Sequence, residues 1–263
     1  MGFDELLGKH ALVCGASQGI GRATAHELAG LGADVTVLAR SVDALERVVA
    51  ELPRRSSAQK HGYIAVDMGN HAELRARIEA VANVQAINIL INNSGGPPGG
   101  QASTATTQAF HDAFNQHLIA AQTILQAILP GMQGSGYGRI VNVISTSVKE
   151  PIRNLGVSNT IRGAVASWSK TLATELGPFG ITVNNVLPGY TRTQRLDQIL
   201  GDRARATGSS EEKIAEGMLA TVPLRRFAEA SEIASVIAFL ASPAAGYING
   251  INVPVDGGRT LSL

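Results

Sequence analysis

The chain has 263 residues, of which 44% are hydrophobic and 16% charged, and its formal net charge at pH 7 is +1. This composition is too apolar for a disordered protein, and the near-zero charge argues against nucleic acid or an anionic membrane as a partner. The single cysteine excludes an intrachain disulfide framework and is typical of a reducing compartment. No apolar run reaches the ~18 residues of a membrane span, and the start of the chain is acidic, unlike a signal peptide. We therefore expect a cytoplasmic protein.

Short apolar runs alternate with helical patterns along the whole chain. The runs are nearly continuous in apolar character, as is typical of strands buried on both faces of a parallel sheet. The predicted strands are His10–Cys14, Asp34–Ala39, Gly62–Val66, Ile87–Asn92, Arg139–Ile144, Thr182–Leu187 and Ile251–Val255. The predicted helices are Ile20–Leu31, Ser41–Leu52, His71–Val81, Thr107–Leu129, Gly163–Leu176 and Ser231–Leu240. This alternation predicts an α/β fold, with one doubly wound parallel sheet and right-handed crossovers.

Nothing in the sequence marks a second domain, since repeats, linkers and low-complexity tracts are absent. Residues 1–263 are therefore predicted to form one domain. Residues 194–222 break the strand–helix rhythm, because they are polar, contain Arg and Gly, and have only a weak helical pattern. Ligands of open α/β sheets lie beyond the carboxyl ends of the strands, so this segment is predicted to be a substrate lid.

The first strand leads through a glycine-rich turn into a helix. Gly15 permits a tight turn, Gly19 lets the backbone approach phosphate oxygens, and Gly21 lets the helix pack close to the strand. The N-terminus of that helix offers free N–H groups and the positive end of its dipole to an anion. Ordinary βα turns share this spacing, so the surrounding residues have to decide. The predicted diphosphate contacts are Gly15, Ser17, Gln18, Gly19, Ile20 and Gly21.

The carboxyl ends of the next strands carry polar residues that suit a dinucleotide. Arg40 lies 19 residues after Gly21, where such folds usually hold an acid for a free 2′-hydroxyl. A guanidinium there suits a 2′-phosphate, so NADP is predicted in preference to NAD. The other predicted contacts are Ser41 beside Arg40, Asp67 and Met68 at the adenine, and Asn93, Ser94 and Gly95 at the adenosine ribose.

Taken together, these motifs make the chain similar to the short-chain dehydrogenase/reductase family, close to its 3-oxoacyl-carrier-protein reductase-like members. The matching features, in chain order, are the glycine turn, Asp67, Asn92–Gly95, Arg139–Ser145, Pro188–Gly189 with Thr191 and Thr193, Pro223–Leu224 before Arg226–Phe227, and Val255–Gly258. The resemblance covers nearly the whole chain. It implies a Rossmann sheet of strand order 3-2-1-4-5-6-7 and an NADP(H)-dependent oxidoreductase acting on a small carbonyl or alcohol compound. It further implies a homotetramer, and a nicotinamide site at Pro188, Gly189, Thr191 and Thr193.

The family's catalytic tetrad, Asn–Ser–Tyr–Lys, is only half present. Asn115 on the long helix and Ser145 closing the fifth strand match the first two members. The family tyrosine usually lies 13 residues beyond the serine and the lysine four further on, and these positions hold Ser158 and Arg162. Counting back from Leu172–Leu176, which matches the end of the family's next helix, gives the same two positions.

These substitutions leave two functions open. Ser158 is far less acidic than a phenol of pKa ~10, and Arg162 keeps a positive charge but cannot titrate. Arg162 is expected to anchor the nicotinamide ribose or a substrate anion, and a water held by Ser145 and Ser158 can replace the proton donor. Tyr190 either takes that role or, as its place in the sequence favours, packs under the lid. The leading hypothesis is an oxidoreductase with this altered relay. The alternative is a catalytically weak or inactive dinucleotide-binding protein with a regulatory or binding role.

Other polar residues near the predicted site have ordinary interpretations as well. His111 and His117 are predicted to be surface or interface residues that face different ways, so no metal site is expected. Arg153, Arg192 and Arg195 are predicted near the mouth of the pocket. There they either favour a substrate that carries a carboxylate or phosphate, or are simply solvated.

Overall fold

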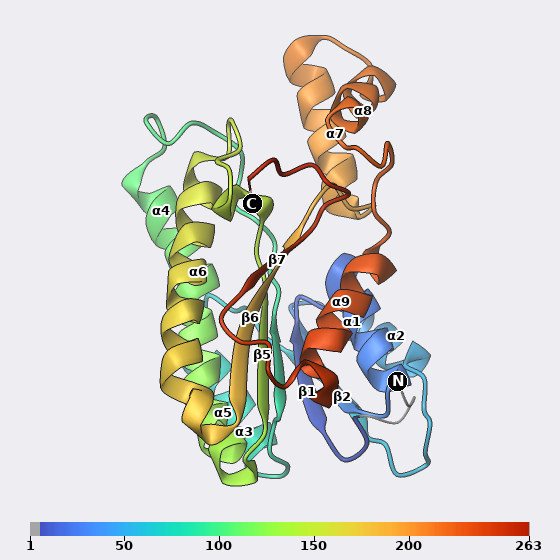
Figure 1. Ribbon diagram of the computed structural model, residues 1–263, viewed down its shortest axis with the longest axis vertical. Helices are drawn as coiled ribbons and strands as arrows, with labels where there is room; N and C mark the ends of the chain where they lie inside the picture. The colour runs from blue at the N-terminus through green and yellow to red at the C-terminus, as the bar shows by residue number, and fades with distance from the viewer. Residues whose placement is uncertain (1–5, 263) are drawn as a thin grey trace.

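One sheet of seven parallel strands forms the centre of the computed structural model, which describes residues 6–262, and helices cover both faces of this sheet (Figure 1). The strand order is β3-β2-β1-β4-β5-β6-β7, which confirms the predicted fold class. Asp4 and Glu5, which make the start of the chain acidic, lie outside the described residues. Across residues 6–262, no helix has the length and apolar character that crossing a membrane requires.

The predicted strands are all present, and their ends differ from prediction by at most two residues. The strands are β1 (His10–Cys14), β2 (Asp34–Ala39), β3 (His61–Ala65), β4 (Ile89–Asn92), β5 (Gly138–Val143), β6 (Ile181–Pro188) and β7 (Asn252–Val255). The main helices are α1 (Gly19–Gly30), α2 (Val42–Glu51), α3 (His71–Ala82), α4 (Thr107–Phe114), α5 (Ala120–Ser135), α6 (Gly156–Leu176), α7 (Gln194–Thr207), α8 (Glu211–Ala220) and α9 (Ala230–Ala241).

Three helical predictions are corrected by the structure. The single helix predicted over Thr107–Leu129 is α4 and α5 joined by a π-helical turn, Asn115–Ile119. Helix α6 begins at Gly156 rather than Gly163, because the glycine at 163 is accommodated inside the helix. The segment predicted to be weakly helical forms two complete helices, α7 and α8.

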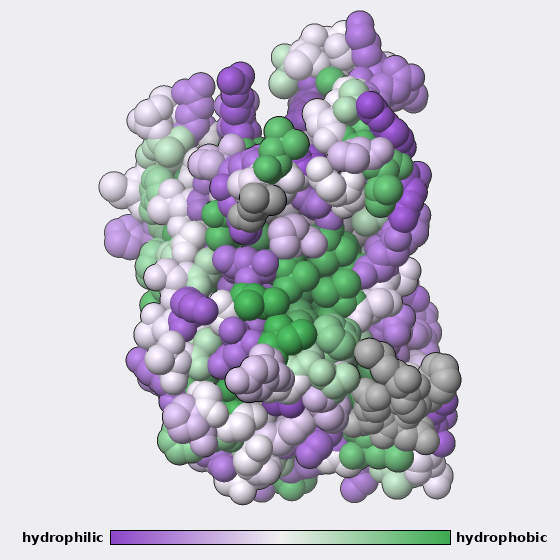
Figure 2. Space-filling view, in the orientation of Figure 1, coloured by the Kyte–Doolittle hydropathy of each residue, from purple (hydrophilic) through white to green (hydrophobic). Residues whose placement is uncertain are grey.

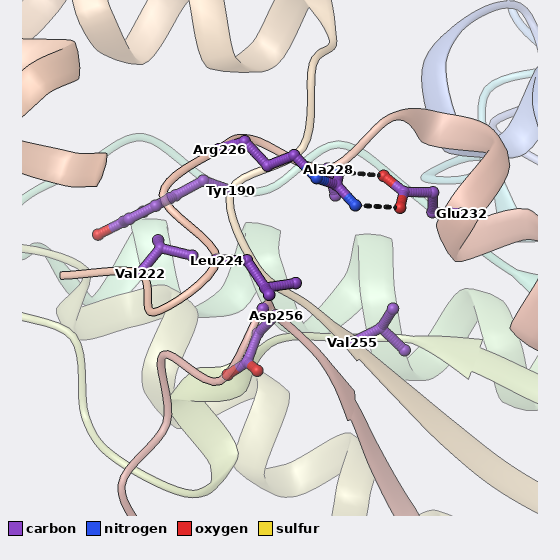
Figure 3. Close-up of a pocket in the computed structure, with 9 residues that line it drawn as sticks. Tyr190, Val222, Leu224, Arg226, Ala228, Glu232, Val255 and Asp256 are labelled. Atoms are coloured by element: carbon purple, nitrogen blue, oxygen red, sulfur yellow. Dashed lines mark hydrogen bonds and ion pairs between the residues drawn. The ribbon is translucent and has the colours of Figure 1, made fainter. Parts of the chain in front are cut away.

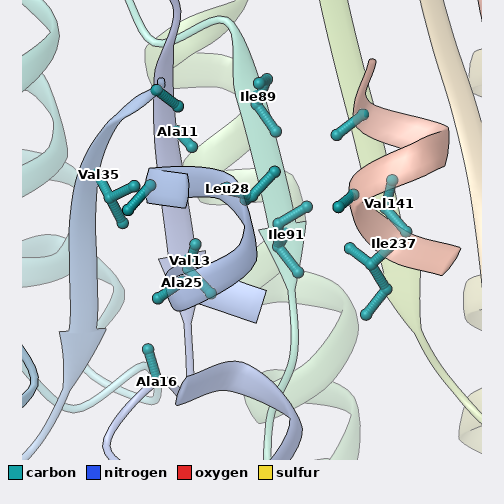
Figure 4. Packing of buried hydrophobic residues seen from close by; sticks show 14 of the residues in the cluster. Ala11, Val13, Ala16, Ala25, Leu28, Val35, Ile89, Ile91, Val141 and Ile237 are labelled. Atoms are coloured by element: carbon teal, nitrogen blue, oxygen red, sulfur yellow. The ribbon is translucent and has the colours of Figure 1, made fainter. Parts of the chain in front are cut away.

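The hydrophobic core lies on both faces of the sheet because successive strand residues point to opposite sides. On one face, Val13 and its neighbours pack against α1, α2 and α9, as Figure 4 shows for Leu28 and Ile237. On the other face, Leu12 and Cys14 pack among residues of α3, α5 and α6. Burial raises the pKa of the Cys14 thiol to about 12, so this cysteine acts as a small apolar residue.

A row of asparagine side chains crosses four strands of the sheet. Asn92, Asn142, Asn185 and Asn252 are register partners on β4, β5, β6 and β7. Each amide nitrogen donates to the next amide oxygen in the row, at distances of 2.8, 3.1 and 2.8 Å. Ser169 of α6 bonds to both middle members at 2.8 Å. The row thereby fixes the register of these strands and ties α6 to them.

Candidate active site

A cleft of about 320 Å³ opens at the carboxyl ends of the central strands. Its walls come from the loops after β1, β4, β5 and β6, from α6 and from the start of α7. The predicted site residues that line it are Gly15, Gln18, Gly19, Ile20, Asn93, Ser94, Gly95, Ser145, Ser158, Arg162, Pro188, Gly189, Thr191 and Thr193. Those that do not line it are Ser17, Gly21, Arg40, Ser41, Asp67, Met68 and Asn115.

The glycine turn has the backbone geometry that its spacing predicted. Gly15 and Gly19 have φ values of 59° and 56°, in the left-handed region that side chains disfavour. A Cβ atom on Gly21 would lie 2.3 Å from the Gly15 carbonyl oxygen, so only glycine lets α1 pack this close to the turn. The Asn93 side chain donates to that same oxygen at 3.1 Å, which joins the loop after β4 to the turn after β1.

The N-terminus of α1 is open to an anion. Its N-cap residue, Gln18, makes no side-chain capping bond, and the first turn holds no acidic residue. The loop after β6 faces it, since the methyl group of Thr193 would lie 3.1 Å from a Cβ on Gly19. Unpaired N–H groups at a helix N-terminus favour phosphate, so the residues present fit a dinucleotide diphosphate.

The residues predicted at the adenosine end lie beyond the cleft. Arg40 is exposed after β2 and forms no ion pair with residues 6–262. The Ser41 hydroxyl already caps α2, accepting from the Ala44 N–H at 3.4 Å, and Asp67 Oδ1 accepts from the Gly69 N–H at 2.8 Å. Because the Met68 side chain is buried in the core, only its backbone is available to a ligand.

Three of the predicted catalytic residues meet in the cleft. Ser145 caps a short 3₁₀ turn, where its Oγ accepts from the Ser147 N–H at 3.1 Å. Ser158 and Arg162 are one turn apart on α6 and so share a face of that helix. Arg162 is only 8% exposed, and its guanidinium donates to the Val143 carbonyl at 3.1 Å.

Asn115, the fourth predicted residue, is not brought to the cleft. It is exposed on the π-helical turn, and its carbonyl oxygen pairs with His71 Nε2 of α3 at 3.0 Å. His117 points inward instead, with 6% exposure and with Nδ1 2.7 Å from the Ser94 hydroxyl oxygen. The prediction that His117 is a surface or interface residue is therefore wrong, whereas His111 is exposed as predicted.

A sequence signal for the position of His117 does exist. It lies four residues after Ala113 and three before Ala120, both of them buried, so helical spacing places it on the apolar face. Burial, and secondarily the charge of Arg162, lowers the pKa of His117 to about 3. The imidazole is therefore neutral at physiological pH, and its buried Nε2 has no hydrogen-bond partner within residues 6–262.

Replacing His117 with asparagine is expected to make the protein less sensitive to acid. Between about pH 6.5, the ordinary histidine pKa, and about pH 3, the unfolded chain binds a proton at this position that the folded chain does not. Stability therefore falls with decreasing pH by up to about 1.4 kcal/mol per pH unit from this group. Urea unfolding at two pH values, one acidic and one neutral, measures the loss. On acidification, the exposed His111→Asn variant should lose as much unfolding free energy as the unaltered chain. An equal loss in His117→Asn would contradict the expectation.

A smaller cavity of about 110 Å³ lies beneath the loop after β6 (Figure 3). Tyr190 borders both this cavity and the cleft. Its ring packs edge-on against Phe227 with centroids 6.3 Å apart, and the Arg259 guanidinium lies 5.0 Å from its centroid. On the other side, Arg226 forms two hydrogen bonds of 2.6 Å with Glu232. Through these contacts Tyr190 packs below α7 and α8.

The three arginines predicted at the pocket mouth have different environments. Arg192 pairs with Glu229 at 3.1 Å, and Arg153 is exposed and does not line the cleft. Only Arg195 lines it, with Nη2 donating to the Pro97 carbonyl at 3.2 Å. No group of three or more potential metal ligands occurs among the described residues.

Residues 15–260 match the family model described as Enoyl-(Acyl carrier protein) reductase. The chain is 30% identical to the NADPH-dependent reductase BacG of Bacillus subtilis (strain 168), over 96% of this chain and 98% of that protein. It is 33% identical to the 3-oxoacyl-(acyl-carrier-protein) reductase FabG of Pseudomonas aeruginosa, over 98% of this chain and 100% of that protein.

Similarity extends to a solved structure, that of L-sorbose reductase from Gluconobacter frateurii complexed with NADPH and L-sorbose. The TM-score is 0.92 at 28% identity, and the match covers 100% of both chains. The fold, the glycine turn and these full-length matches agree. The chain therefore belongs to the short-chain dehydrogenase/reductase family and lies close to its FabG-like and BacG-like reductases.

Proposed function

We propose that the protein is an NADP(H)-dependent oxidoreductase that interconverts a carbonyl compound and an alcohol with an altered catalytic site. The supporting observation is that the glycine turn and the Ser145, Ser158 and Arg162 side chains line one continuous cleft. The turn follows β1 and Ser145 follows β5, two strands away, so the two ends of the cleft are about 10 Å apart. NADPH, when bound, supplies the hydride that, with one proton, converts the carbonyl to an alcohol and leaves NADP⁺.

The cofactor would be held along this edge of the sheet. The turn after β1 and the N-terminus of α1 would take the diphosphate, and Arg40 with Ser41 would take the 2′-phosphate. Asp67, the Met68 backbone and the Asn93–Gly95 loop would take the adenosine. The nicotinamide end would be held by Pro188, Gly189, Thr191 and Thr193, and its ribose or a substrate anion by Arg162.

The proton at the substrate oxygen follows a different route from that of a complete tetrad. Ser145 and Ser158 orient the carbonyl oxygen and a water that serves as the proton source. Arg162 stays charged, so it stabilises negative charge that develops on that oxygen without delivering a proton. His117 does not line the cleft either, but its Nδ1 lies 2.7 Å from the hydroxyl oxygen of Ser94, which does, so we assign to His117 the positioning of Ser94.

Fluorescence titration with NADPH, followed by 340-nm absorbance across a panel of aldehydes, ketones and 2-oxo acids, tests the proposal. Binding with steady consumption of NADPH on some carbonyl supports an oxidoreductase. A second candidate is a non-catalytic dinucleotide-binding protein. The lining of the cleft favours it, because Arg162, Arg195 and Tyr190 are the only ionisable side chains among the described residues that line the cleft. Tight NADPH binding with no turnover on the whole panel would select this candidate.

Replacing Arg40 with aspartate is expected to reverse the cofactor preference. An exposed guanidinium favours a 2′-phosphate, whereas a carboxylate repels that phosphate and accepts a hydrogen bond from a free 2′-hydroxyl. Loss of the charge-assisted bonds should weaken NADPH about tenfold or more, while NADH binds more tightly. Dissociation constants for both cofactors provide the measurement. Arg77→Asp on α3 makes the same charge change away from the cleft, and similar constants for the native chain and Arg40→Asp would refute the assignment.

We also propose a lid and an assembly. The lid would consist of α7 and α8, within residues 194–222. Leu196 of α7, Met218 of α8 and Phe227 form a small apolar cluster that is separate from the two cores on the sheet. Such a cluster suits a lid that moves as one unit. Figure 2 shows apolar surface gathered over the middle of the face that carries β7, the edge strand, where Ile251 is exposed. This apolar edge supports a homotetramer. Light scattering tests it by comparing the molar mass of the native chain in solution with that of Ile251→Lys.

A further inference from the structure

The Arg162 and Arg195 side chains approach the same point of the cleft from different helices. Arg162 belongs to α6, and Arg195 belongs to the first turn of α7. A methyl group on Gly96, in the loop after β4, would lie 3.9 Å from Arg162 Nη2 and 4.0 Å from Arg195 Nη2. Two guanidinium groups therefore meet beside one glycine that leaves space between them.

Neither guanidinium has a carboxylate partner within residues 6–262. Arg162 reaches the carbonyls of Val143 and Ser94, at 3.1 and 3.5 Å, and Arg195 reaches only that of Pro97. Each guanidinium has five N–H donors, so several stay unused in both. Among residues 6–262, no Asp or Glu lines the cleft, so this part of the chain provides a positive site without a carboxylate counter-ion.

The two charges also act on each other. Burial, and next the charge of Arg195, lowers the pKa of Arg162 to about 10. A buried cation beside a second cation is costly unless an anion compensates both. Arg192, by contrast, pairs with Glu229 at 3.1 Å and does not line the cleft.

We propose that the substrate is a carbonyl compound carrying an oxyanion, a carboxylate or a phosphate, and that this oxyanion binds between Arg162 and Arg195. The proposal rests on the proposed oxidoreductase function and names its substrate class. Planar guanidinium forks match such oxyanions through paired hydrogen bonds, and a cleft of one charge sign concentrates them. Leu155, Leu196 and Ile199 line the same cleft and suit an apolar remainder of the substrate.

The diphosphate of the cofactor has a different place. Its predicted cradle is the N-terminus of α1 after β1, whereas Arg162 lies beside Val143 at the end of β5. Strand β4 lies between β1 and β5, so the glycine turn and the Val143 carbonyl belong to strands two places apart in the sheet. The arginine pair is therefore on the side of Ser145 and Ser158, where the carbonyl reacts.

Matched substrate pairs test the proposal. 4-Methyl-2-oxopentanoate is compared with its methyl ester, and dihydroxyacetone phosphate with dihydroxyacetone, each pair sharing its reacting carbonyl. The native chain should prefer one anionic member by about 10- to 100-fold in kcat/KM, and the pair that shows this preference identifies the oxyanion. Arg195→Gln should remove most of the preference through KM and leave the NADPH dissociation constant unchanged. Arg192→Gln, already paired outside the cleft, should retain it.

Two outcomes would overturn the inference. One is equal kcat/KM within both pairs, and the other is an Arg195→Gln variant that weakens NADPH rather than the anionic substrate. Calorimetry of the NADPH-loaded protein with oxamate and with inorganic phosphate tests the anion site separately from the oxidoreductase activity. Saturable binding that Arg195→Gln abolishes, without turnover of any carbonyl, keeps the anion site and refutes the oxidoreductase. Turnover of neutral carbonyls without a preference for the anionic members keeps the oxidoreductase and refutes the anion site.

Discussion

Replacing Ser158 with tyrosine and Arg162 with lysine in the same chain is expected to raise turnover of simple ketones by about 10²- to 10⁴-fold, the usual contribution of a placed general acid. The position of Ser158 in the cleft lets a phenol reach the space where Ser145 orients the substrate oxygen. Lysine at 162, one turn away, would lower the pKa of that phenol by its charge. Steady-state kinetics with NADPH on a ketone panel measures the gain in kcat.

The control for this variant separates acid catalysis from filling of the cleft. Ser158→Phe with Arg162→Lys adds the ring without the hydroxyl and should give no gain. Lysine at 162 cannot make both bonds of Arg162, to the Val143 and Ser94 carbonyls. The melting temperature should therefore be measured beside the kinetics, to show that the variant is folded. A folded double variant that binds NADPH and shows no gain on any ketone would contradict the assignment of Ser158 and Arg162 as the altered catalytic positions.

Replacing Gly21 with alanine is expected to abolish NADPH binding or folding. The new methyl group would lie 2.3 Å from the Gly15 carbonyl oxygen and 2.8 Å from Asn93 Nδ2, contacts that no Cβ sustains. To relieve them, α1 has to move away from the turn, which removes the N–H groups aimed at the phosphate. The expected loss of NADPH affinity is about 100-fold or more, measured by fluorescence titration alongside circular dichroism.

Gly134→Ala provides the matched control, because Gly134 also lies in a helix and a methyl group there meets nothing within 4 Å. It should bind NADPH as the native chain does. If Gly21→Ala fails to fold, Gly19→Ala carries the test, since its φ of 56° and the Thr193 methyl at 3.1 Å strain only the turn. Native affinity in both Gly21→Ala and Gly19→Ala would overturn the assignment of the turn as the phosphate site.

The fold was predictable because its signal is local. Apolar runs of strand length followed by helical spacing need no knowledge of distant contacts, and the strand ends therefore located most of the cleft. Asn115 shows where this fails. Asn115 was placed in the site by its match to the tetrad, but the buried face of this helix carries Ala113, His117 and Ala120, and Asn115 lies on the exposed side. Helical spacing of the apolar residues was the better guide to this position than the motif match.

The approach of Arg162 to Arg195 was likewise beyond local reasoning. The two residues lie on helices separated by β6, and their meeting depends on how α7 is placed over the loop after β4. The sequence identified both as possible anion contacts. Only the packing distinguishes Arg195 from Arg192, whose charge is satisfied by Glu229.

The asparagine row has a consequence for how the sheet opens. It joins β4, β5, β6 and β7 by side-chain bonds in addition to their backbone ladder, and no such row crosses from β4 to β1. Native-state hydrogen exchange should therefore divide the sheet into two cooperative units at that boundary, where the Asn93 side chain bonds to the Cys14 and Gly15 carbonyls. The glycine turn lies on one side and Ser145 on the other. A dinucleotide bound across the boundary would join the two units and slow their separate opening.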